Sequence, residues 1–202
     1  MPLYSNKHTN NRIVALWHIS ESKEELEEML PKSWLEKLDL ARVRKHNLAA
    51  RVLAHTVCPD FDILEKDEYG KPYFESTTHK ISLSHAGDYA AFQLNENDEC
   101  GIDMEKITHR IKRIKDKFMR EDEHPFLDFG LRGMYLVWCA KEALYKYYGL
   151  KALDFKQHMK IDFTPLDQES GSFTGHIGKD DYQKTLKLDY TFFDDYLMVN
   201  TQ

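Results

Sequence analysis

Apolar residues recur along this chain with two spacings, and each spacing predicts a different kind of element. Recurrence every three or four residues indicates helices. The first of these begins at Ser22, which forms a capping box with Glu25, and the last ends at Gly149, a residue type common after a helix C-terminus. The predicted helices cover residues 22–30, 33–57, 107–120 and 131–148.

Short segments that are rich in β-branched or aromatic residues, or that alternate between apolar and polar residues, indicate strands. The predicted strands cover residues 13–20, 61–66, 80–84, 89–94, 100–106, 160–163, 171–177, 186–192 and 196–200. Helices and antiparallel meanders are mixed without regular strand–helix–strand alternation, so the pattern predicts an α+β fold. With 202 residues, the chain is long enough for one large domain or two small ones.

The composition is that of a folded protein with a modest acidic balance. Hydrophobic residues make up 42% of the chain, which is enough to build a core and excludes a disordered protein. Lys and Arg number 28 and Asp and Glu number 34, which gives a net charge of −6. This charge disfavours a dedicated nucleic-acid binder, because such proteins bind largely by neutralising phosphates.

Two features bear on the cellular location. The cysteines Cys58, Cys100 and Cys139 are scattered and odd in number, so they indicate no disulfide framework and suit a reducing compartment. The apolar run Ile13–Ile19 is too short to cross a membrane and lacks the flanks of a signal peptide. We therefore expect a cytoplasmic protein that does not associate with a membrane.

The first candidate for chemistry is an acidic pair on the predicted strand 100–106. Asp103 and Glu105 are two residues apart, so their carboxylates project from the same side of the strand, about 7 Å from each other. Two carboxylates at this spacing repel each other unless a cation lies between them, and oxygen-only ligands favour Mg²⁺. The alternative is an ordinary amphipathic strand whose acidic residues face water.

The second candidate lies on the predicted helix 131–148. Glu142 and Lys146 are one turn apart on the same helix face, and Trp138 lies one turn before Glu142. This arrangement could supply a third carboxylate for a metal ion and a cation beside a phosphate. The alternative is an ordinary helix ion pair next to a core tryptophan.

The third candidate is the segment Ser82-Leu83-Ser84-His85, in which two serines share a polar strand face that leads into a turn. The turn exposes His85, whose ring could donate a hydrogen bond to a phosphate oxygen. The alternative is a surface histidine without a special role. The nearby segment Gly70-Lys71-Pro72 presents a lysine in a stiff turn, which is a weak signal by itself.

These motifs occur together and in one order: Gly70-Lys71-Pro72, Ser82-Leu83-Ser84-His85, Gly101-Ile102-Asp103-Met104-Glu105, and the helical segment WCAKEALYK over residues 138–146. In this combination the sequence resembles the 4′-phosphopantetheinyl transferase superfamily, in particular its larger, surfactin-type members. The resemblance covers most of the chain. It implies two similar α+β halves packed as an intramolecular pseudo-dimer, here residues 1–106 and 107–202. The active site would lie in the cleft between them, with Asp103 and Glu105 of the first half facing Glu142 and Lys146 of the second.

The resemblance also implies an activity. A member of this family transfers the 4′-phosphopantetheine group from coenzyme A to a serine of an apo acyl or peptidyl carrier protein, and releases adenosine 3′,5′-bisphosphate. The implied Mg²⁺ ligands are Asp103, Glu105 and Glu142; the implied catalytic residues are Glu142, Lys146 and His85; the implied coenzyme A contacts are Arg44, Arg51, Lys71, Ser84, His85 and Lys146. Arg42, Lys45 and His46 compete with Arg44 and Arg51 for the 3′-phosphate. A monomer is expected, because the pseudo-dimer would close the site within one chain.

The predicted helix 107–120 is strongly basic and directly follows the acidic strand, and the acidic loop Glu121-Asp122-Glu123 follows it. Carrier proteins of the family resemble acidic helical bundles. We therefore expect an apo carrier protein to dock on Lys112, Arg113 and Lys117 through electrostatic steering, with a solvated helix face as the alternative.

Two other functions stay open. The chain could be another Mg²⁺-dependent phosphate-ester enzyme that uses the same carboxylates, or a catalytically silent homologue that binds coenzyme A. Nucleic-acid binding through the basic stretch is a third interpretation, and the net charge of −6 disfavours it.

Overall fold

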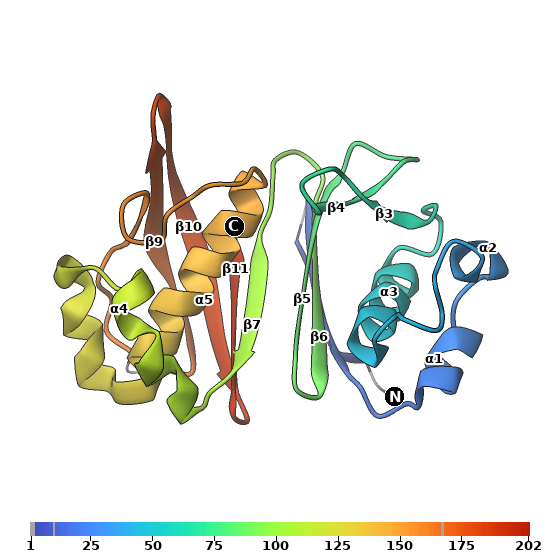
Figure 1. Cartoon of the computed structure of the whole chain (residues 1–202), viewed down its shortest axis with the longest axis horizontal. Coiled ribbons are helices and arrows are strands. Elements are labelled where there is room, and N and C mark those ends of the chain that lie inside the picture. Colours follow the sequence, from blue (N-terminus) through green and yellow to red (C-terminus); the bar gives the residue numbers. More distant parts are fainter. Residues whose placement is uncertain (1–2, 10, 167) are drawn as a thin grey trace. The chain divides into compact units, whose positions relative to one another are not determined.

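The computed structural model describes residues 3–9, 11–166 and 168–202, and it divides the chain into two compact units, Met1–Glu99 and Cys100–Gln202. Each unit combines an antiparallel sheet with helices and has a hydrophobic core of its own. This mixture of elements confirms the predicted α+β fold (Figure 1). Among the described residues, no helix has both the length and the apolar composition that are needed to cross a membrane.

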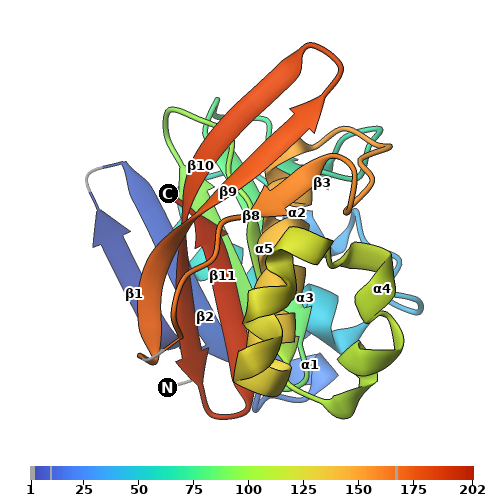
Figure 2. The same ribbon diagram turned by 90° about the vertical axis from the view of Figure 1, so that its left-hand side faces the viewer.

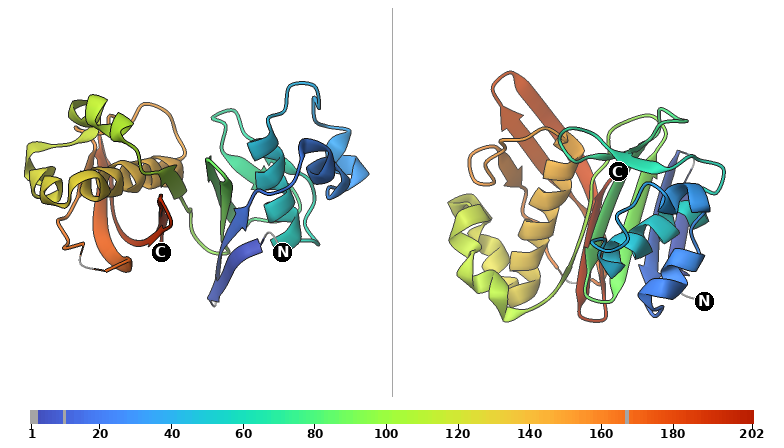
Figure 3. Two further views of the ribbon diagram at one scale, coloured as in Figure 1. Left: turned by 90° about the horizontal axis from the view of Figure 1, so that it is seen from below. Right: turned by 45° about the vertical axis from the view of Figure 1, so that its right-hand side comes forward.

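The first unit is built on a four-stranded antiparallel sheet in the order β1-β2-β6-β5, and β3 and β4 form a separate antiparallel pair. Helix α3 covers one face of the sheet (Figure 3), and its Leu48, Val52 and Leu53 share a core with Phe92 of β6. The elements are β1 (Leu3–Thr9), β2 (Arg12–His18), α1 (Lys23–Glu28), α2 (Lys32–Leu35), α3 (Lys45–Val57), β3 (Leu64–Lys66), β4 (Pro72–Phe74), β5 (Lys80–Ala86) and β6 (Tyr89–Asn95).

Most predictions for this unit are confirmed, and one is wrong. The capping box at Ser22 starts α1 as predicted. The single helix predicted over residues 33–57 is instead the short α2 and the separate α3, which begins after the extended residue Arg44. From Leu38 to Leu48 the apolar positions that suggested one helix recur every five residues. This spacing does not keep them on one face of a helix. Strands β1 and β4 were not predicted, because β1 is polar and β4 begins within the expected turn.

The second unit is built on a five-stranded antiparallel sheet in the order β7-β11-β10-β9-β8. Helix α5 packs on one face of it, and Leu136, Ala140 and Leu144 share a core with Leu188 and Val199 of the sheet. A segment of 3-10 turns and one short helix lies beside α5 (Figure 2). The elements are β7 (Ile102–Lys106), η1 (His109–Arg113), α4 (Lys115–Phe118), η2 (Glu121–Phe129), α5 (Gly130–Tyr148), β8 (Met159–Ile161), β9 (Ser170–Lys179), β10 (Tyr182–Phe193) and β11 (Tyr196–Thr201), where η denotes a 3-10 helix.

Two glycines shape the surroundings of α5. The helix ends as predicted at Gly149, which has the left-handed φ of 72° that glycine adopts without steric cost. Just before β7, a Cβ atom on Gly101 would lie 1.9 Å from the backbone oxygen of Ala143. Only a glycine at this position lets the start of β7 approach α5 so closely, and this approach brings the acidic residues of β7 under the helix.

The helix predicted over residues 107–120 is wrong. The structure has the 3-10 turn η1 and the one-turn helix α4 there, with Ile111 and Phe118 buried against the core. Like charges one turn apart, such as Arg113 and Lys117, destabilise a longer helix at this point. The predicted acidic loop after it is the 3-10 helix η2.

Glu123 of η2, which was predicted to belong to an acidic loop, is fully buried. One of its oxygens accepts hydrogen bonds from Lys141 Nζ at 2.7 Å and from the backbone N–H of Arg120 at 2.9 Å. The other oxygen accepts from the backbone N–H of Ile161 at 2.8 Å. Lys141 is also fully buried, and it donates to the carbonyl of Phe118 as well. This carboxylate therefore joins η2, α5 and β8.

The expected boundary between the halves, residues 1–106 and 107–202, is corrected. Strand β7 pairs with β11, so residues 100–106 belong to the second unit. Asp103 and Glu105 are therefore in the same unit as Glu142 and Lys146, and the expectation that they come from different halves is wrong. The reason is that β7 completes the sheet beneath α5 instead of ending the first sheet.

The two units share one order of strands, although the residues themselves show no repeat; two similar halves were implied by the family resemblance alone. In each unit the last strand, β6 or β11, lies between two other strands of its sheet. One neighbour is the strand just before it in the chain, β5 or β10, and the other is an early strand, β2 or β7. The order β2-β6-β5 thus corresponds to β7-β11-β10, and the long helices α3 and α5 occupy the same place in the chain order.

Replacing Lys141 by Met should strongly destabilise the protein, because the buried carboxylate of Glu123 would lose its charged partner. Removing one member of a buried ion pair costs about 3–5 kcal/mol. Urea unfolding measures this loss, with the exposed Lys151→Met as the matched control. The double variant Lys141→Met, Glu123→Leu should recover much of the stability. Equal unfolding midpoints for Lys141→Met and the unaltered protein would contradict the assignment.

Candidate active site

The acidic pair of β7 faces helix α5. In the register of β7 with β11, Asp103 lies opposite Val199 and Glu105 lies opposite Leu197, and both apolar partners belong to the core beneath α5. Residues directly opposite each other point to the same face of a sheet, so the acidic face is the one that the helix covers. Asp103 is only 5% exposed, which excludes the alternative of two acidic residues in open water.

Lys146 connects α5 to this strand. Its ammonium group donates to Asp103 Oδ1 at 2.7 Å and to the backbone carbonyl of Ile102 at 2.9 Å. Glu142 lies one turn earlier on the helix and interacts electrostatically with Lys146, Asp103 and Glu105. We call Asp103, Glu105, Glu142 and Lys146 the acidic cluster. Lys146 therefore does more than the ordinary helix ion pair that was the alternative, because it binds a second element.

Trp138 orients the other acidic residue of β7. Its indole N–H donates to Glu105 Oε1 at 3.1 Å, and its ring contacts the rings of Phe118 and Phe155. The tryptophan is therefore a core residue and a partner of the acidic cluster at once. Cys139, the next residue on α5, is completely buried; burial and the nearby charge of Asp103 raise the pKa of its thiol, which keeps it protonated.

The carboxylates of the acidic cluster hinder the ionisation of one another. Burial raises the pKa of Glu142 to about 7, and the charges of Asp103 and Glu105 add to this effect while Lys146 opposes it. Burial and the charge of Asp103 also raise the pKa of Glu105, against the hydrogen bond from Trp138 and the charge of Lys146. Three carboxylates share one ammonium group, so the cluster favours an additional proton or cation.

The donor atoms of the cluster suit a hard divalent cation. Asp103, Glu105 and Glu142 offer oxygen ligands only, as Mg²⁺ prefers, and burial together with the neighbouring carboxylates raises the pKa values of the two glutamates. Across the described ranges of the chain, no three His, Cys, Asp or Glu side chains are close enough together to form a metal-binding group. The three predicted ligands are thus electrostatic neighbours that do not converge on one point, and the metal site stays a prediction.

In the first unit, the start of α3 and the end of β5 bring basic side chains together. The rings of His46 and His85 are 5.4 Å apart, and His46 Nε2 hydrogen-bonds to the carbonyl of Gly87 at 2.8 Å. Arg44 is exposed at the N-cap of α3, and the first turn of this fully described helix contains no acidic residue. Because a helix N-terminus carries partial positive charge, this end of α3 suits an anion.

Lys71 is placed in a different environment. It forms a short ion pair with Glu99, and Lys80 approaches the same carboxylate at 3.4 Å. Lys71 also lines a cavity of about 390 Å³, whose wall includes Tyr73 and His79. An anion that binds Lys71 must therefore compete with Glu99, a partner for which the sequence offered no signal.

Two further predicted contacts lie within the first unit. Arg51 turns back onto α3 and donates from Nη1 to the carbonyl of Asn47 at 3.1 Å, and burial lowers its pKa. Ser84 is 8% exposed on β5 and shares its strand face with Ser82, as the alternating pattern predicted. His46 was considered only for the 3′-phosphate, and its contact with His85 could not be deduced because they are far apart in the sequence.

Without divalent cations, Glu142→Gln should make the protein more stable at pH 8 than the unaltered protein, with little effect at pH 5. The folded-state pKa of Glu142, about 7, is above the ordinary value of 4.5, so its ionisation opposes folding. The penalty is absent below pH 4.5, grows as the pH rises towards 7, and is complete above it, up to about 3 kcal/mol.

Thermal unfolding in EDTA at both pH values tests this expectation. The exposed Glu121→Gln serves as the control, because it removes a carboxylate without affecting the cluster. An equal effect of Glu142→Gln at pH 5 and pH 8 would contradict a raised pKa for Glu142.

Comparison with known proteins bears on the same segment. A family model described as the 4′-phosphopantetheinyl transferase superfamily matches residues 99–199, which is half of the chain. The 4′-phosphopantetheinyl transferase gsp of Aneurinibacillus migulanus is 29% identical over 97 residues, which cover 45% of this chain and 40% of that protein. The 4′-phosphopantetheinyl transferase AcpT of Escherichia coli O157:H7 is 32% identical over 129 residues, which cover 59% of this chain and 66% of that protein.

The chain thus spans less than two thirds of the length of each of these relatives. The segment matched by the family model runs from the start of β7 through α5 to β11 and contains the whole acidic cluster. The chain belongs to the 4′-phosphopantetheinyl transferase superfamily.

Proposed function

We propose that this protein transfers the 4′-phosphopantetheine group of coenzyme A to a serine of an apo acyl or peptidyl carrier protein. The observation that carries the proposal is the acidic cluster, in which Lys146 of α5 binds Asp103 of β7 and burial raises the pKa of Glu142 to about 7. Phosphoryl transfer depends mainly on positioning and on neutralising negative charge, and a cluster of oxygen ligands beside a lysine supplies both. The family and the two relatives support the same activity.

In this proposal Asp103, Glu105 and Glu142 would hold Mg²⁺. When bound, the ion would neutralise the pyrophosphate of coenzyme A and stabilise the departing phosphate. The hydrogen bond from Trp138 fixes the direction of one Glu105 oxygen, so that the other oxygen is the one available to a ligand.

The chain's own residues then position and deprotonate the reactants. The serine hydroxyl of the carrier attacks the phosphorus on the pantetheine side, and the bond from that phosphorus to the bridging pyrophosphate oxygen breaks. Adenosine 3′,5′-bisphosphate leaves with the electron pair. Glu142 accepts the serine proton, for which a pKa near the working pH is suitable. Lys146 offsets the charge that develops on the transferred phosphate.

We further propose that the first unit binds coenzyme A. His85 and the basic start of α3 would contact phosphate groups, with Arg44 at the helix N-cap and His46 held against His85. Arg51, Lys71 and Ser84 are the other proposed contacts. Lys71 would exchange Glu99 for a phosphate on binding.

The location and the oligomeric state belong to the proposal as well. The cysteines Cys58, Cys100 and Cys139 are buried and form no disulfide, which supports a protein of the reducing cytoplasm. We propose that a single chain is active, because both sets of proposed residues are present within it.

The proposed activity is tested by intact-mass spectrometry of an apo acyl carrier protein and an apo peptidyl carrier domain. Each is incubated with this protein, coenzyme A and Mg²⁺, with a parallel sample in EDTA. A mass gain of one phosphopantetheine group that disappears in EDTA supports the transferase. Binding of coenzyme A without transfer to either carrier indicates the silent homologue instead, and hydrolysis of coenzyme A without a carrier indicates another phosphate-ester enzyme.

Asp103→Asn and Glu142→Gln should each lower the transfer rate by at least about 100-fold, because each removes a charge on which the reaction depends. The matched control is Asp128→Asn, which changes an exposed acidic residue of the same unit. Circular dichroism confirms that each variant is folded. A nearly normal rate for either cluster variant would show that the assignment of these carboxylates is wrong.

The basic stretch after β7 is the proposed docking surface for the acidic carrier. Lys112 and Arg113 of η1 and Lys117 of α4 are all exposed, although they lie on short helices and not on the single helix that was expected. Exposed charges of one sign raise the rate of encounter with an oppositely charged partner.

The double reversal Lys112→Glu, Arg113→Glu should raise the KM for the carrier and leave the affinity for coenzyme A unchanged. Steady-state kinetics and calorimetry measure the two quantities. The control Lys66→Glu, Lys187→Glu changes the net charge by the same amount at exposed positions elsewhere. If both double variants raise the KM equally, the effect comes from net charge and the docking surface is refuted.

A further inference from the structure

The hairpin turn between β5 and β6 follows His85 directly and is held from two sides. Only Gly87 and Asp88 lie between the paired residues of the two strands. Gly87 has a φ of 50°, and a positive φ at the first loop position is typical of tight hairpin turns. The backbone N–H of Ile19, just after β2, donates to the carbonyl of Asp88 at 2.7 Å. The turn is therefore tied on one side to the end of the neighbouring strand.

His46, in the first turn of α3, holds the other side of this turn. Its Nε2 atom is 2.8 Å from the carbonyl oxygen of Gly87. A carbonyl oxygen only accepts hydrogen bonds, so the proton of this bond is on Nε2 whether the ring is neutral or charged. The bond joins residues that are 41 positions apart in the chain, and it fixes the hairpin turn to the N-terminal end of α3.

The same histidine lies beside the ring of His85. The two ring centres are 5.4 Å apart, and the ring planes are inclined by 33°. His85 is exposed, whereas His46 is half-buried. An exposed side chain loses conformational freedom when it binds a ligand, and a neighbour that already limits its motion lowers this cost. His46 therefore restrains His85 twice, through the backbone of the turn and through the contact of the rings.

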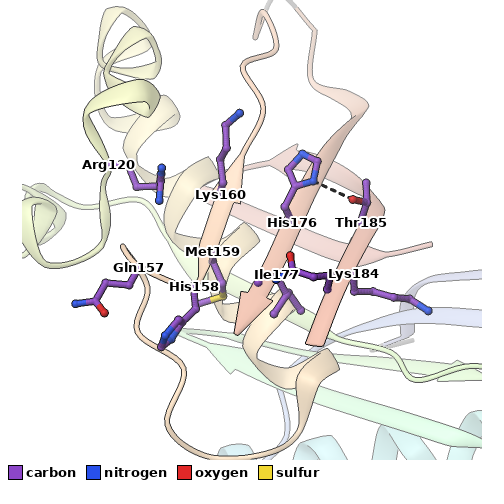
Figure 4. Close-up of a pocket in the computed structure, with 11 residues that line it drawn as sticks. Arg120, Gln157, His158, Met159, Lys160, His176, Ile177, Lys184 and Thr185 are labelled. Carbon is purple, nitrogen blue, oxygen red and sulfur yellow. Dashed lines mark hydrogen bonds between the residues drawn. The ribbon is translucent and has the colours of Figure 1, made fainter. Parts of the chain in front are cut away.

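A histidine of the second unit offers a comparison. His176 of β9 uses Nδ1 in a hydrogen bond with Thr185 at 3.0 Å (Figure 4) and Nε2 in one with Asp162 at 2.9 Å. In the strand order, β10 and β11 separate β9 from β7 and its acidic residues. These bonds join side chains in and next to one sheet. His46 differs, because its bond goes to the backbone of a turn whose exposed neighbour is a proposed ligand contact.

We propose that His46 is a positioning residue for coenzyme A, which holds the β5–β6 turn so that the ring of His85 meets a phosphate group. This inference rests on the proposed function, in which His85 contacts a phosphate of coenzyme A. It gives His46 a role through His85 in place of a direct contact with the 3′-phosphate. The proton on Nε2 is used in the bond to Gly87, so this nitrogen has none to donate to a phosphate.

Two amide substitutions test the hydrogen bond itself. In His46→Gln the side-chain nitrogen can occupy the position of Nε2, so a donor to Gly87 is kept. In His46→Asn the shorter side chain reaches only as far as Nδ1, and the donor is lost. Calorimetry should show about fivefold weaker binding of coenzyme A by His46→Asn and nearly unaltered binding by His46→Gln. Unaltered binding by His46→Asn, or equal losses in both variants, would overturn the proposal.

A double-mutant cycle separates positioning from direct contact. His85→Ala should weaken the binding of coenzyme A about tenfold, because a hydrogen bond to a charged phosphate is lost. If His46 acts through His85, the double variant His46→Asn, His85→Ala should bind no more weakly than His85→Ala alone. Independent contacts with phosphates would instead multiply the two losses to about fiftyfold, and this result would refute a positioning role.

The matched control is His176→Asn, which removes the Nε2 donor of another half-buried histidine and should leave the affinity for coenzyme A unchanged. Circular dichroism confirms that each variant is folded. In steady-state kinetics, His46→Asn should raise the KM for coenzyme A and not the KM for the carrier, whereas a general loss of structure would affect both.

The failure of this inference can be told apart from the failure of the proposed function. If the unaltered protein binds no coenzyme A, the proposed function is wrong and the role of His46 is refuted with it. If the unaltered protein binds coenzyme A and His46→Asn binds it equally well, the role of His46 alone is refuted.

Discussion

The buried carboxylate of Glu123 is the interaction on which the second unit depends. It accepts hydrogen bonds from the ammonium group of Lys141 and from the backbone N–H groups of Arg120 and Ile161. A buried charge is tolerated only when it is paired and its hydrogen-bonding capacity is met, so the three donors must stay together. One side chain thereby fixes the 3-10 helix η2, the long helix α5 and the edge strand β8 to each other.

Two of the features to which we assign functions lie on or next to the elements that this carboxylate joins. The exposed cations of η1 and α4 directly precede η2 in the chain, and Arg120, whose backbone N–H binds Glu123, lies between them and η2. Successive residues of an α-helix point about 100° apart, so α5 can direct Lys141 into the core and Glu142 towards β7. The same helix therefore anchors the fold and carries half of the acidic cluster.

How well the sequence predicts a feature of this molecule depends on how far apart in the chain the interacting residues are. Local signals were reliable: the capping box at Ser22, the glycine stop after α5 and the strand that is β7 are all confirmed. The pairing of β7 with β11 joins residues almost one hundred positions apart, and no local pattern encodes it. For this reason the four residues of the acidic cluster were expected to lie together, as they do, but were assigned to two halves, and their chemistry stays a prediction. Glu123 was misplaced for the same reason, because its burial depends on Lys141 and Ile161 and not on its acidic neighbours.

The two lysines that α5 directs to carboxylates differ in how their charge is balanced. Lys141 and Glu123 are one cation and one anion whose further hydrogen bonds are satisfied, and such a balanced pair can serve the fold alone. Lys146 shares its charge among three carboxylates, whose burial and mutual repulsion raise the pKa of Glu142 to about 7. Ionisation of that cluster weakens the folded state, so stability does not account for it. A bound proton or a divalent cation relieves the repulsion. The excess of negative charge that is unfavourable to the fold is therefore the same property that would let these residues bind Mg²⁺ and accept a proton from a hydroxyl group.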